Sequence, residues 1–365
     1  MATIITEFPP YSFLEDLPDV TIYGVTSEAY ITVIFAGASL MSNIKMTPNA
    51  QDRITIYTKQ IIRNMLSLAR PDTVVLPSPI LQVRVRINAE TLSTECHVIP
   101  GGTDGNEVIN KEWFSKNFLT WQPQIIITTP EQPQWLAYIP TDIYDATNLS
   151  STLYTKDGRS FSKTIDAVSS SSASFYRQIK TDFASLWENV CSENDLDPVC
   201  YDVYGVGFNY GEQNSQNKLL LPQRYILRPE RYNDMCFGFE NTLGGFDTLI
   251  LEGKQSYQPD GDVTTFKTHT TEKELINDYT SFWEANTGRI ETEREANQFQ
   301  DFFKSKNRYI FHQGIWHRII VSEYKVKHSR GESNSYTFKY HLADKNESRY
   351  FERTELPEVE LPTII

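Results

Sequence analysis

The strongest constraint on this chain is a period-two alternation of apolar and polar residues in many short segments. It is clearest in Ala29–Phe35, Leu81–Ile87 and Tyr336–Leu342. Successive side chains of a strand point to opposite faces, so this pattern predicts antiparallel strands with one buried and one solvated face. Turn residues bound the remaining predicted strands, which are Ile54–Tyr57, Gln124–Thr129, Trp135–Ile139, Val199–Val206, Tyr225–Leu227, Phe246–Leu251, Tyr309–Phe311 and Arg318–Val326.

Three segments depart from this alternation and predict helices near 175–190, 272–284 and 293–304. The apolar residues that recur at helical spacing in the first are Phe175, Ile179, Phe183, Leu186, Trp187 and Val190. The other two follow capping boxes, Thr271–Glu274 and Thr292–Glu295, in which Thr and Glu satisfy backbone N–H groups of the first turn. We expect two or three short helices that cover a sheet.

The length of 365 residues exceeds the size at which a single hydrophobic core stops growing. We therefore expect two mainly β domains of antiparallel β-sandwich type, divided near residue 150 in the polar stretch 141–172, with one large β domain as the alternative. The first would span 20–150, and the second, 151–350, would be β-rich α+β with the covering helices. Residues 1–19 and 351–365 are rich in proline and acidic groups, which predicts extended terminal arms.

Charge and hydropathy restrict the partners. The formal net charge is −13, so we expect no nucleic-acid partner. One basic stretch, from Lys304 to Arg330, is expected to be a solvated strand face or a contact to acidic neighbouring subunits. The N-terminus has no signal-peptide pattern and no long apolar run occurs, which predicts that the chain stays in the cytoplasm of the cell that makes it, without membrane insertion.

The sequence contains no strong catalytic or metal motif. It lacks Gly-x-Ser-x-Gly, His-Glu-x-x-His and a Walker-type Gly-Lys-Ser/Thr. The weak alternatives are a zinc site at His312 and His317, a catalytic dyad at Cys96 and His97, and a calcium site at Glu193–Asp197. We predict no enzyme activity and no catalytic, cofactor-binding or metal-binding residue. A carboxylate pair for glycoside hydrolysis stays open, because such residues come from distant strands.

Two further local patterns have plain structural interpretations. The cysteines Cys96, Cys191, Cys200 and Cys236 form no Cys-x-x-Cys pair, so we expect reduced thiols, with a Cys191–Cys200 bridge as the alternative. The glycine-rich segment Gly205–Gly211 does not match a phosphate-binding loop and predicts a β turn.

The densest local signature is Met235–Gly253, which predicts a hairpin whose turn glycines, Gly244 and Gly245, take positive φ. Its Asn-x-Leu-Gly-Gly-aromatic-Asp segment resembles uncharacterised proteins from the tail regions of phages and prophages of Bacteroidetes. The segments Phe302–Lys306 and Ser335–Tyr340 are similar to the same group, so the resemblance covers roughly residues 200–345. It implies no catalytic residues.

These observations lead to a hypothesis of function. We expect a tail-associated virion structural protein, such as a distal-tail or tail-tip component, that contacts other tail proteins and forms a homo-oligomeric ring. Its terminal arms would strap neighbouring subunits. The alternative is a carbohydrate-binding module for adsorption to a host surface glycan, with exposed Trp113, Trp121 or Trp135 as stacking platforms. A glycoside hydrolase is the third hypothesis.

Overall fold

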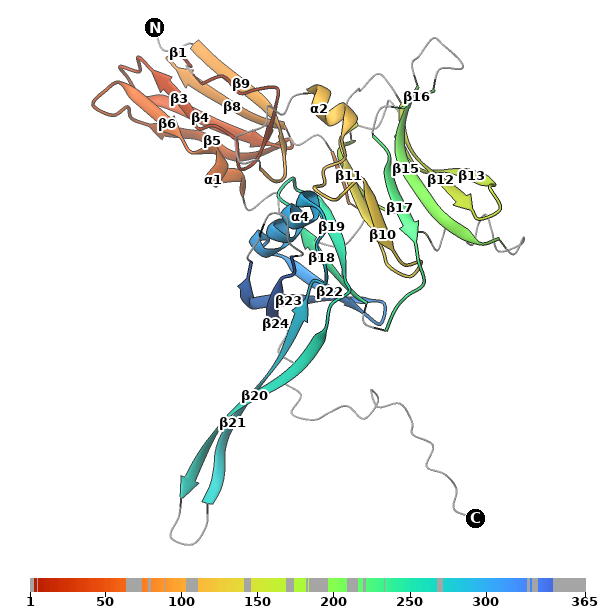
Figure 1. Cartoon of the computed structure of the whole chain (residues 1–365). Coiled ribbons are helices and arrows are strands. Elements are labelled where there is room, and N and C mark those ends of the chain that lie inside the picture. The colour runs from red at the N-terminus through yellow and green to blue at the C-terminus, as the bar shows by residue number, and fades with distance from the viewer. Residues whose placement is uncertain are drawn as a thin grey trace, which may run out of the picture.

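The computed structural model is mainly β, with several antiparallel sheets, as the alternation predicts (Figure 1). It describes residues 3–4, 6–63, 74–77, 80–88, 90–102, 111–140, 146–168, 174–181, 183, 196–208, 216–218, 221–232, 234–267, 272–326, 329 and 334–343. No helix within these residues is long and apolar enough to cross a membrane.

The N-terminal part is a β sandwich. Its larger sheet has the order β2-β9-β8-β4-β5 and its smaller sheet the order β1-β3-β6. The strands are β1 (Thr3–Ile4), β2 (Tyr11–Phe13), β3 (Val20–Tyr23), β4 (Ala29–Phe35), β5 (Ala38–Met46), β6 (Arg53–Ile56), β8 (Ile80–Ile87) and β9 (Glu90–Ile99). Alternate residues such as Val33, Val85 and Ile22 point inward from both sheets into one core, which confirms the period-two interpretation.

Residues 6–19 are not a loose arm. Phe8, Leu14 and Leu17 are buried in the core of the N-terminal sandwich, and β2 pairs in parallel with β9. The segment therefore packs on its own chain, which corrects the expectation that it straps a neighbouring subunit. The expected C-terminal arm, 351–365, lies outside the described residues.

A second pair of sheets follows. One has the order β11-β14-β7 and the other the order β10-β17-β15-β12-β13, with β16 paired to β15. The strands are β7 (Val74–Pro77), β10 (Ile125–Thr128), β11 (Trp135–Tyr138), β12 (Ala146–Thr155), β13 (Ser160–Val168), β14 (Ser174–Lys180), β15 (Pro198–Phe208), β16 (Gln216–Lys218) and β17 (Gln223–Leu227). Leu136, Ile179 and Tyr201 share the core between the sheets. The division into two domains stays a prediction, but residue 150 lies inside β12.

The C-terminal sheet has the order β19-β18-β22-β23-β24-β21-β20, and all its neighbours are antiparallel. Its strands are β18 (Met235–Glu240), β19 (Phe246–Leu251), β20 (Gln255–Lys267), β21 (Glu272–Asn286), β22 (Arg308–His312), β23 (Ile315–Lys325) and β24 (Thr337–Leu342). Helix α4 (Glu293–Lys304) packs Phe299, Phe302 and Phe303 into a core that includes Phe237 and Phe338. The short helices α1 (Thr58–Ile62) and α2 (Lys111–Lys116) lie earlier in the chain.

One predicted helix is confirmed and two predictions need correction. Helix α4 begins after Thr292, and the capping box between Thr292 and Glu295 is formed. Residues 272–284 are strand, not helix, because they pair along their length with β20. Residues 174–180 are strand β14, and the rest of the predicted helix 175–190 lies outside the described residues except Thr181 and Phe183. The glycine-rich turn is also wrong in its described part, since Gly205–Phe208 continues β15.

The β18–β19 hairpin is confirmed and lies where the parts of the chain meet. Gly244 takes φ +82° in its turn, as predicted, whereas Gly245 is not among the positive-φ glycines. Leu243 in the same turn packs with Phe13, Ile99 and Tyr176, which come from the two preceding parts. This small core fixes the C-terminal sheet against both sandwiches.

Candidate functional site

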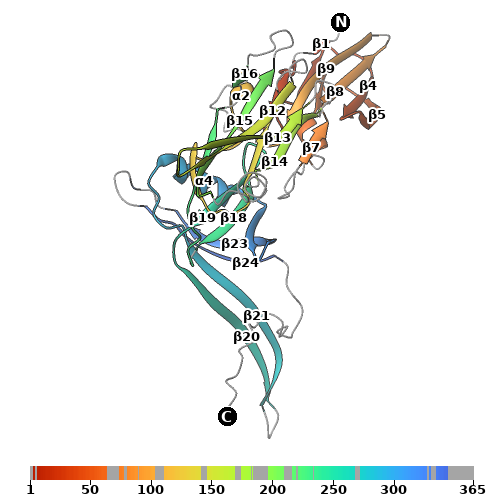
Figure 2. The same ribbon diagram turned by 90° about the vertical axis from the view of Figure 1, so that its right-hand side faces the viewer.

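The most distinctive feature of the molecule is the β20–β21 hairpin. Figures 1 and 2, which are views at right angles, both show it running out beyond the rest of the described chain as a two-stranded ribbon. Its strands have 13 and 15 residues, and β24 pairs with only the last four residues of β21, Trp283–Asn286. We call residues 258–267 and 272–281 the hairpin arm. Beyond Trp283, no described strand flanks either edge of the arm.

The base of the arm is held firmly. The ring of Trp283 stacks on that of Tyr340 at 5.8 Å, and Tyr257 lies 5.5 Å from Trp283. The Gln255 amide donates to the Tyr340 hydroxyl at 2.7 Å. A Cβ at Gly253 would lie 2.2 Å from the carbonyl oxygen of Asn286, so this crossing requires glycine. These contacts fix the direction in which the arm leaves the sheet.

A second feature is a strip of positive charge on the same sheet. We call residues 304–326 the basic segment, which contains β22 and β23; its lysines and arginines are Lys304, Lys306, Arg308, Arg318 and Lys325, and its only acidic residue is Glu323. Glu323 is taken by an ion pair to Lys339 at 3.2 Å. Arg318 and Lys325 are exposed and form no ion pair with a described carboxylate. The structure thus places Arg318 and Lys325 of the predicted basic stretch on a solvated strand face, whereas Arg308 is half-buried with its guanidinium 5.9 Å from the centre of the Phe302 ring.

The two faces of β23 differ. Ile319 is buried beneath α4, and Tyr324 stacks on Phe303 of that helix at 4.7 Å. Strand alternation, together with the register shift between Val321 and Glu323, puts Arg318, Ile320 and Lys325 on the opposite face, which we call the open face. Ile320 is 47 % exposed there, so the open face combines an apolar side chain with two unneutralised cations. This combination is typical of a protein-binding surface.

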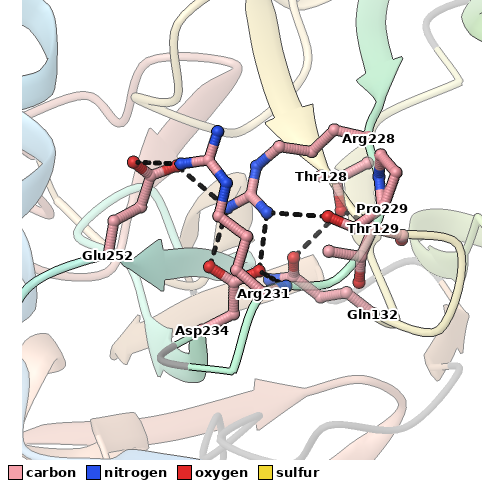
Figure 3. Close-up of polar contacts among 8 residues, drawn as sticks. All are labelled: Thr128, Thr129, Gln132, Arg228, Pro229, Arg231, Asp234 and Glu252. Atoms are coloured by element: carbon pink, nitrogen blue, oxygen red, sulfur yellow. Dashed lines mark hydrogen bonds and ion pairs between the residues drawn. The ribbon is translucent and has the colours of Figure 1, made fainter.

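A polar cluster joins the ends of three strands (Figure 3). Arg228, which follows β17, donates to both carboxylate oxygens of Asp234 at 2.6 and 2.8 Å and to Glu252 at 2.8 Å. The backbone N–H of Arg231 also donates to Asp234 at 2.7 Å. Burial favours the neutral form of Asp234, but the bonds from Arg228 and Arg231 outweigh it and lower the pKa of this carboxyl. The cluster clamps the second pair of sheets to the C-terminal sheet.

A cleft of about 270 Å³ adjoins this cluster. Its lining includes Glu131, Glu230, Asp234 and His312, together with Cys236, which carries a free thiol. Gln132 donates to that thiol at 3.1 Å, and burial raises the pKa of Cys236. The carboxylate of Asp234 is already paired with Arg228, and no group of three metal-ligating side chains occurs among the residues that the structure describes. The cleft is therefore acidic, and its aspartate is engaged in an ion pair.

A buried polar network lies under the β18–β19 turn. Gln122 and Gln298 both donate to the carbonyl oxygen of Thr248, at 2.6 and 3.2 Å. Asp247 is buried, and its burial raises the pKa to about 7, with the nearby Asp301 charge adding to the rise. Among the described residues, none donates a hydrogen bond to Oδ2 of Asp247. We assign this network to the joint between the parts of the chain.

The structure places the weak chemical candidates of the sequence as follows. Cys96 faces the core, where burial raises the pKa of its thiol to about 12, whereas His97 stacks on Tyr11 at 5.2 Å. The register of the β22–β23 hairpin pairs His312 with Ile315 and His317 with Ile310, so both histidines lie on one face, but no group of three metal-ligating side chains includes them among the described residues. The segment Glu193–Asp195 of the calcium alternative lies outside the described residues.

The remaining predicted residues are placed as follows. Trp135 is buried against Phe246 and Trp316, so it offers no stacking platform to a glycan. Trp113 and Trp121 are half-buried, and Trp121 donates to the Thr242 hydroxyl at 2.8 Å. Cys96, Cys200 and Cys236 are free thiols, so no Cys191–Cys200 bridge is formed, and Cys191 lies outside the described residues.

Sequence reasoning missed the arm because it assigned β21 to a helix. A signal was present in the neighbouring run Val263-Thr264-Thr265-Phe266, whose β-branched and aromatic residues favour a strand. Such a strand needs a partner, and the adjacent segment 272–286 is the nearest one that can form a hairpin with it.

Comparisons with known proteins do not assign a family. No protein-family model and no curated protein matches the chain. Solved structures align over most of it with low similarity. A complex of Dpr2 Ig1-Ig2 with DIP-Theta Ig1-Ig3 has 9 % identity, covers 95 % of this chain and 92 % of that chain, and has a TM-score of 0.19. The glucan-utilization protein SGBP-B of Bacteroides ovatus, with a bound mixed-linkage heptasaccharide, has 9 % identity, coverages of 93 % and 99 % and a TM-score of 0.15.

These TM-scores are too low to carry an argument about the function of this chain. The resemblance of residues 200–345 to phage tail-region proteins therefore stays a prediction.

Proposed function

We propose that this chain is a structural component of a larger protein assembly, of the kind found in phage tails, and that it works through protein–protein contacts without covalent chemistry. The observation that carries the proposal is the hairpin arm, which extends away from the body and is flanked by no other described strand. The assignment to a phage tail also draws on the resemblance of the Met235–Gly253 segment to proteins from phage tail regions.

The arm is an element that gains stability from a partner. An isolated two-stranded hairpin is marginally stable in water, and its outer edges carry backbone N–H and C=O groups that a further strand can pair with. The arm sequence also contains apolar residues, among them Val263, Phe266 and Tyr279. A partner that pairs with an arm edge would supply both missing backbone bonds and apolar contacts, as in strand addition.

The rigid base supports the same proposal. The contacts of Trp283 with Tyr340 and of Gln255 with Tyr340 hold the arm in one direction before any partner binds. A preorganised arm loses less conformational freedom on binding, which favours tight association. An assembly protein benefits from such an arm because it sets the geometry between neighbours.

Immunolabelling of particles tests the proposal. Antibody raised against the chain should label one end of the tail in negatively stained particles released from the producing cells. A variant in which Asn-Gly replaces residues 259–281 should fold but be lost from the particles, because Gln258 and Phe282 are paired and a two-residue turn can join them.

The control is a chain with Lys156→Glu and Lys163→Glu in the distant β12–β13 hairpin, which should be incorporated normally. Complete particles without label, with the chain left in the soluble fraction, would contradict the proposal. Selective binding of an oligosaccharide by the chain without its arm would favour the carbohydrate-binding alternative instead.

A further inference from the structure

The charges of the C-terminal sheet are separated along the chain. Residues 255–286, which form the arm and its base, contain six acidic residues and two lysines. Residues 304–330 contain seven lysines and arginines and one glutamate. In a chain with a net charge of −13 the second region is an exception, so its partner is expected to be acidic.

We propose that the acidic arm of one copy of this chain docks on the open face of β23 in a second copy. This inference rests on the proposed function and names the partner of the arm. The open face supplies the exposed cations Arg318 and Lys325 around the exposed apolar side chain Ile320. The apolar centre with a charged surround matches the general anatomy of protein interfaces.

The arm of a chain does not reach its own basic segment. In both views the arm points away from β22 and β23 after it leaves the sheet beside β24 (Figures 1 and 2). The contacts of Trp283 and Gln255 with Tyr340 fix that direction. The basic segment that the arm meets therefore belongs to another copy.

Pairing of two arms is the competing arrangement. Strand β20 is the edge of its sheet, so two copies offer their β20 edges for symmetric antiparallel pairing. That contact would bring two strongly acidic segments together, and like charges on adjacent strands are destabilising. Contact between the arm and the open face joins opposite charges and is head-to-tail, so each copy uses one arm and one open face.

Sedimentation velocity of the purified chain and two variants tests the inference. The arm-less variant has Asn-Gly in place of residues 259–281, and the face variant carries Arg318→Glu and Lys325→Glu. At roughly 50 µM and low salt the unaltered chain should self-associate, with at least about tenfold weaker association when salt rises to roughly 0.5 M. Each variant alone should be monomeric.

A mixture of the two variants gives the decisive result. The arm-less chain supplies only an open face and the face variant only an arm, so together they should form a heterodimer that grows no further. The Lys156→Glu and Lys163→Glu chain has the same charge change on distant exposed residues and should associate like the unaltered chain. Thermal melts show whether each variant is folded.

Two outcomes overturn the inference. If the face variant still dimerises and the mixture forms no heterodimer, the arms pair with each other. If the unaltered chain stays monomeric under these conditions, the partner of the arm is not a second copy. In that case immunolabelling of particles still decides the proposed function, because it does not depend on self-association of the purified chain.

Discussion

Two consecutive hairpins of the C-terminal sheet have opposite surroundings. The β18–β19 hairpin is flanked by β22 and lies against β11, and both faces of β18 bear buried residues such as Phe237 and Gly238. The β20–β21 hairpin has one neighbour, β24, over four residues and then projects from the body (Figure 2). The same local motif therefore lies at the joint of the molecule in one case and, as we propose, contacts another molecule in the other.

The comparison teaches that hairpin formation and hairpin role are set by different residues. Cross-strand pairing forms both hairpins, with continuous registers in β18–β19 and one register shift in β20–β21. The two hairpins differ in the contacts that their turn and their base make with neighbouring elements. The β18–β19 turn contacts Leu119 and Pro100 of the two preceding parts, whereas the described contacts of Tyr340 with the base of the arm lie within its own sheet.

The largest difference in stability between variants of the two hairpins is expected when a core aromatic ring is removed. The Phe237 ring contacts Phe302, Phe338 and Tyr340 at centroid distances of 5.4 to 5.9 Å. Phe237→Ala should lower the free energy of unfolding by about 4 kcal/mol, measured by urea titration, because it leaves a cavity among these rings. The matched change Tyr257→Ala, at a side chain that is 50 % exposed beside the arm, should lower it by less than about 1 kcal/mol. Equal losses would mean that the two hairpins are equally integrated.

The turn glycines sharpen the comparison. Gly244 has φ +82°, and a Cβ there would lie 2.1 Å from the carbonyl oxygen of Pro100. Gly244→Ala should therefore cost about 3 kcal/mol, from backbone strain and displacement of the neighbouring strand end. Gly158 has φ +86° with open space around it, so Gly158→Ala should show the strain alone, about 1 kcal/mol. Equal chemical-denaturation midpoints for the two variants would refute the proposed close contact.

The contrast also explains how far the sequence predicts this fold. Strands with alternating burial, such as Ala29–Phe35, were predicted because burial of one face produces a local alternation of apolar and polar residues. Helix α4 was predicted because Thr292, Glu295 and its apolar stripe all belong to one segment. Residues 272–284 carry similar helical signals, but long-range pairing with β20 prevailed over them. The Phe175 to Ile179 spacing is also ambiguous, since an interval of four fits a strand face as well as a helix.

The candidate site was harder to predict than the fold. The basic stretch was recognised from charge alone, but only the structure separates the covered side chain of Ile319 from the exposed Ile320. The polar network beneath the β18–β19 turn joins Gln122 to Thr248 across 126 residues, so no local pattern marks it. Charge and strand content can therefore be predicted from the sequence, whereas contacts between residues far apart in the chain cannot.

A smaller effect on the free energy of unfolding is expected from a change in pH. Folding raises the pKa of Asp247 from 3.8 to about 7, so between these values the folded chain keeps a proton that the unfolded chain has lost. This group makes stability fall as pH rises through that window and remain constant above it. Asp247→Asn removes this loss, so the free energy of unfolding of the variant relative to the unaltered chain should rise by about 1 kcal/mol between about pH 6 and about pH 8.

The Asp234 carboxyl has the opposite effect on the pH dependence of stability. Its pKa is lowered in the folded chain, so its contribution is present at neutral pH and is lost as pH falls through the acidic range. Asp234→Asn should therefore destabilise most at neutral pH, and its effect should shrink on acidification.

The Asp247 prediction has its own contradicting outcome. If the effect of Asp247→Asn on the free energy of unfolding did not depend on pH, the Asp247 carboxyl would not titrate in the folded chain.

The smallest effect on stability is expected from removing the arm itself. Replacing residues 259–281 with Asn-Gly keeps the Tyr257–Trp283 contact and all pairs between β21 and β24. The free energy of unfolding should therefore change by no more than about 1 kcal/mol in chemical denaturation. A loss as large as that of Phe237→Ala would mean that the arm supports the fold of its own chain. An unchanged stability together with lost association would separate the two roles, because a segment that leaves the fold intact and abolishes contact with other molecules acts outside its own core.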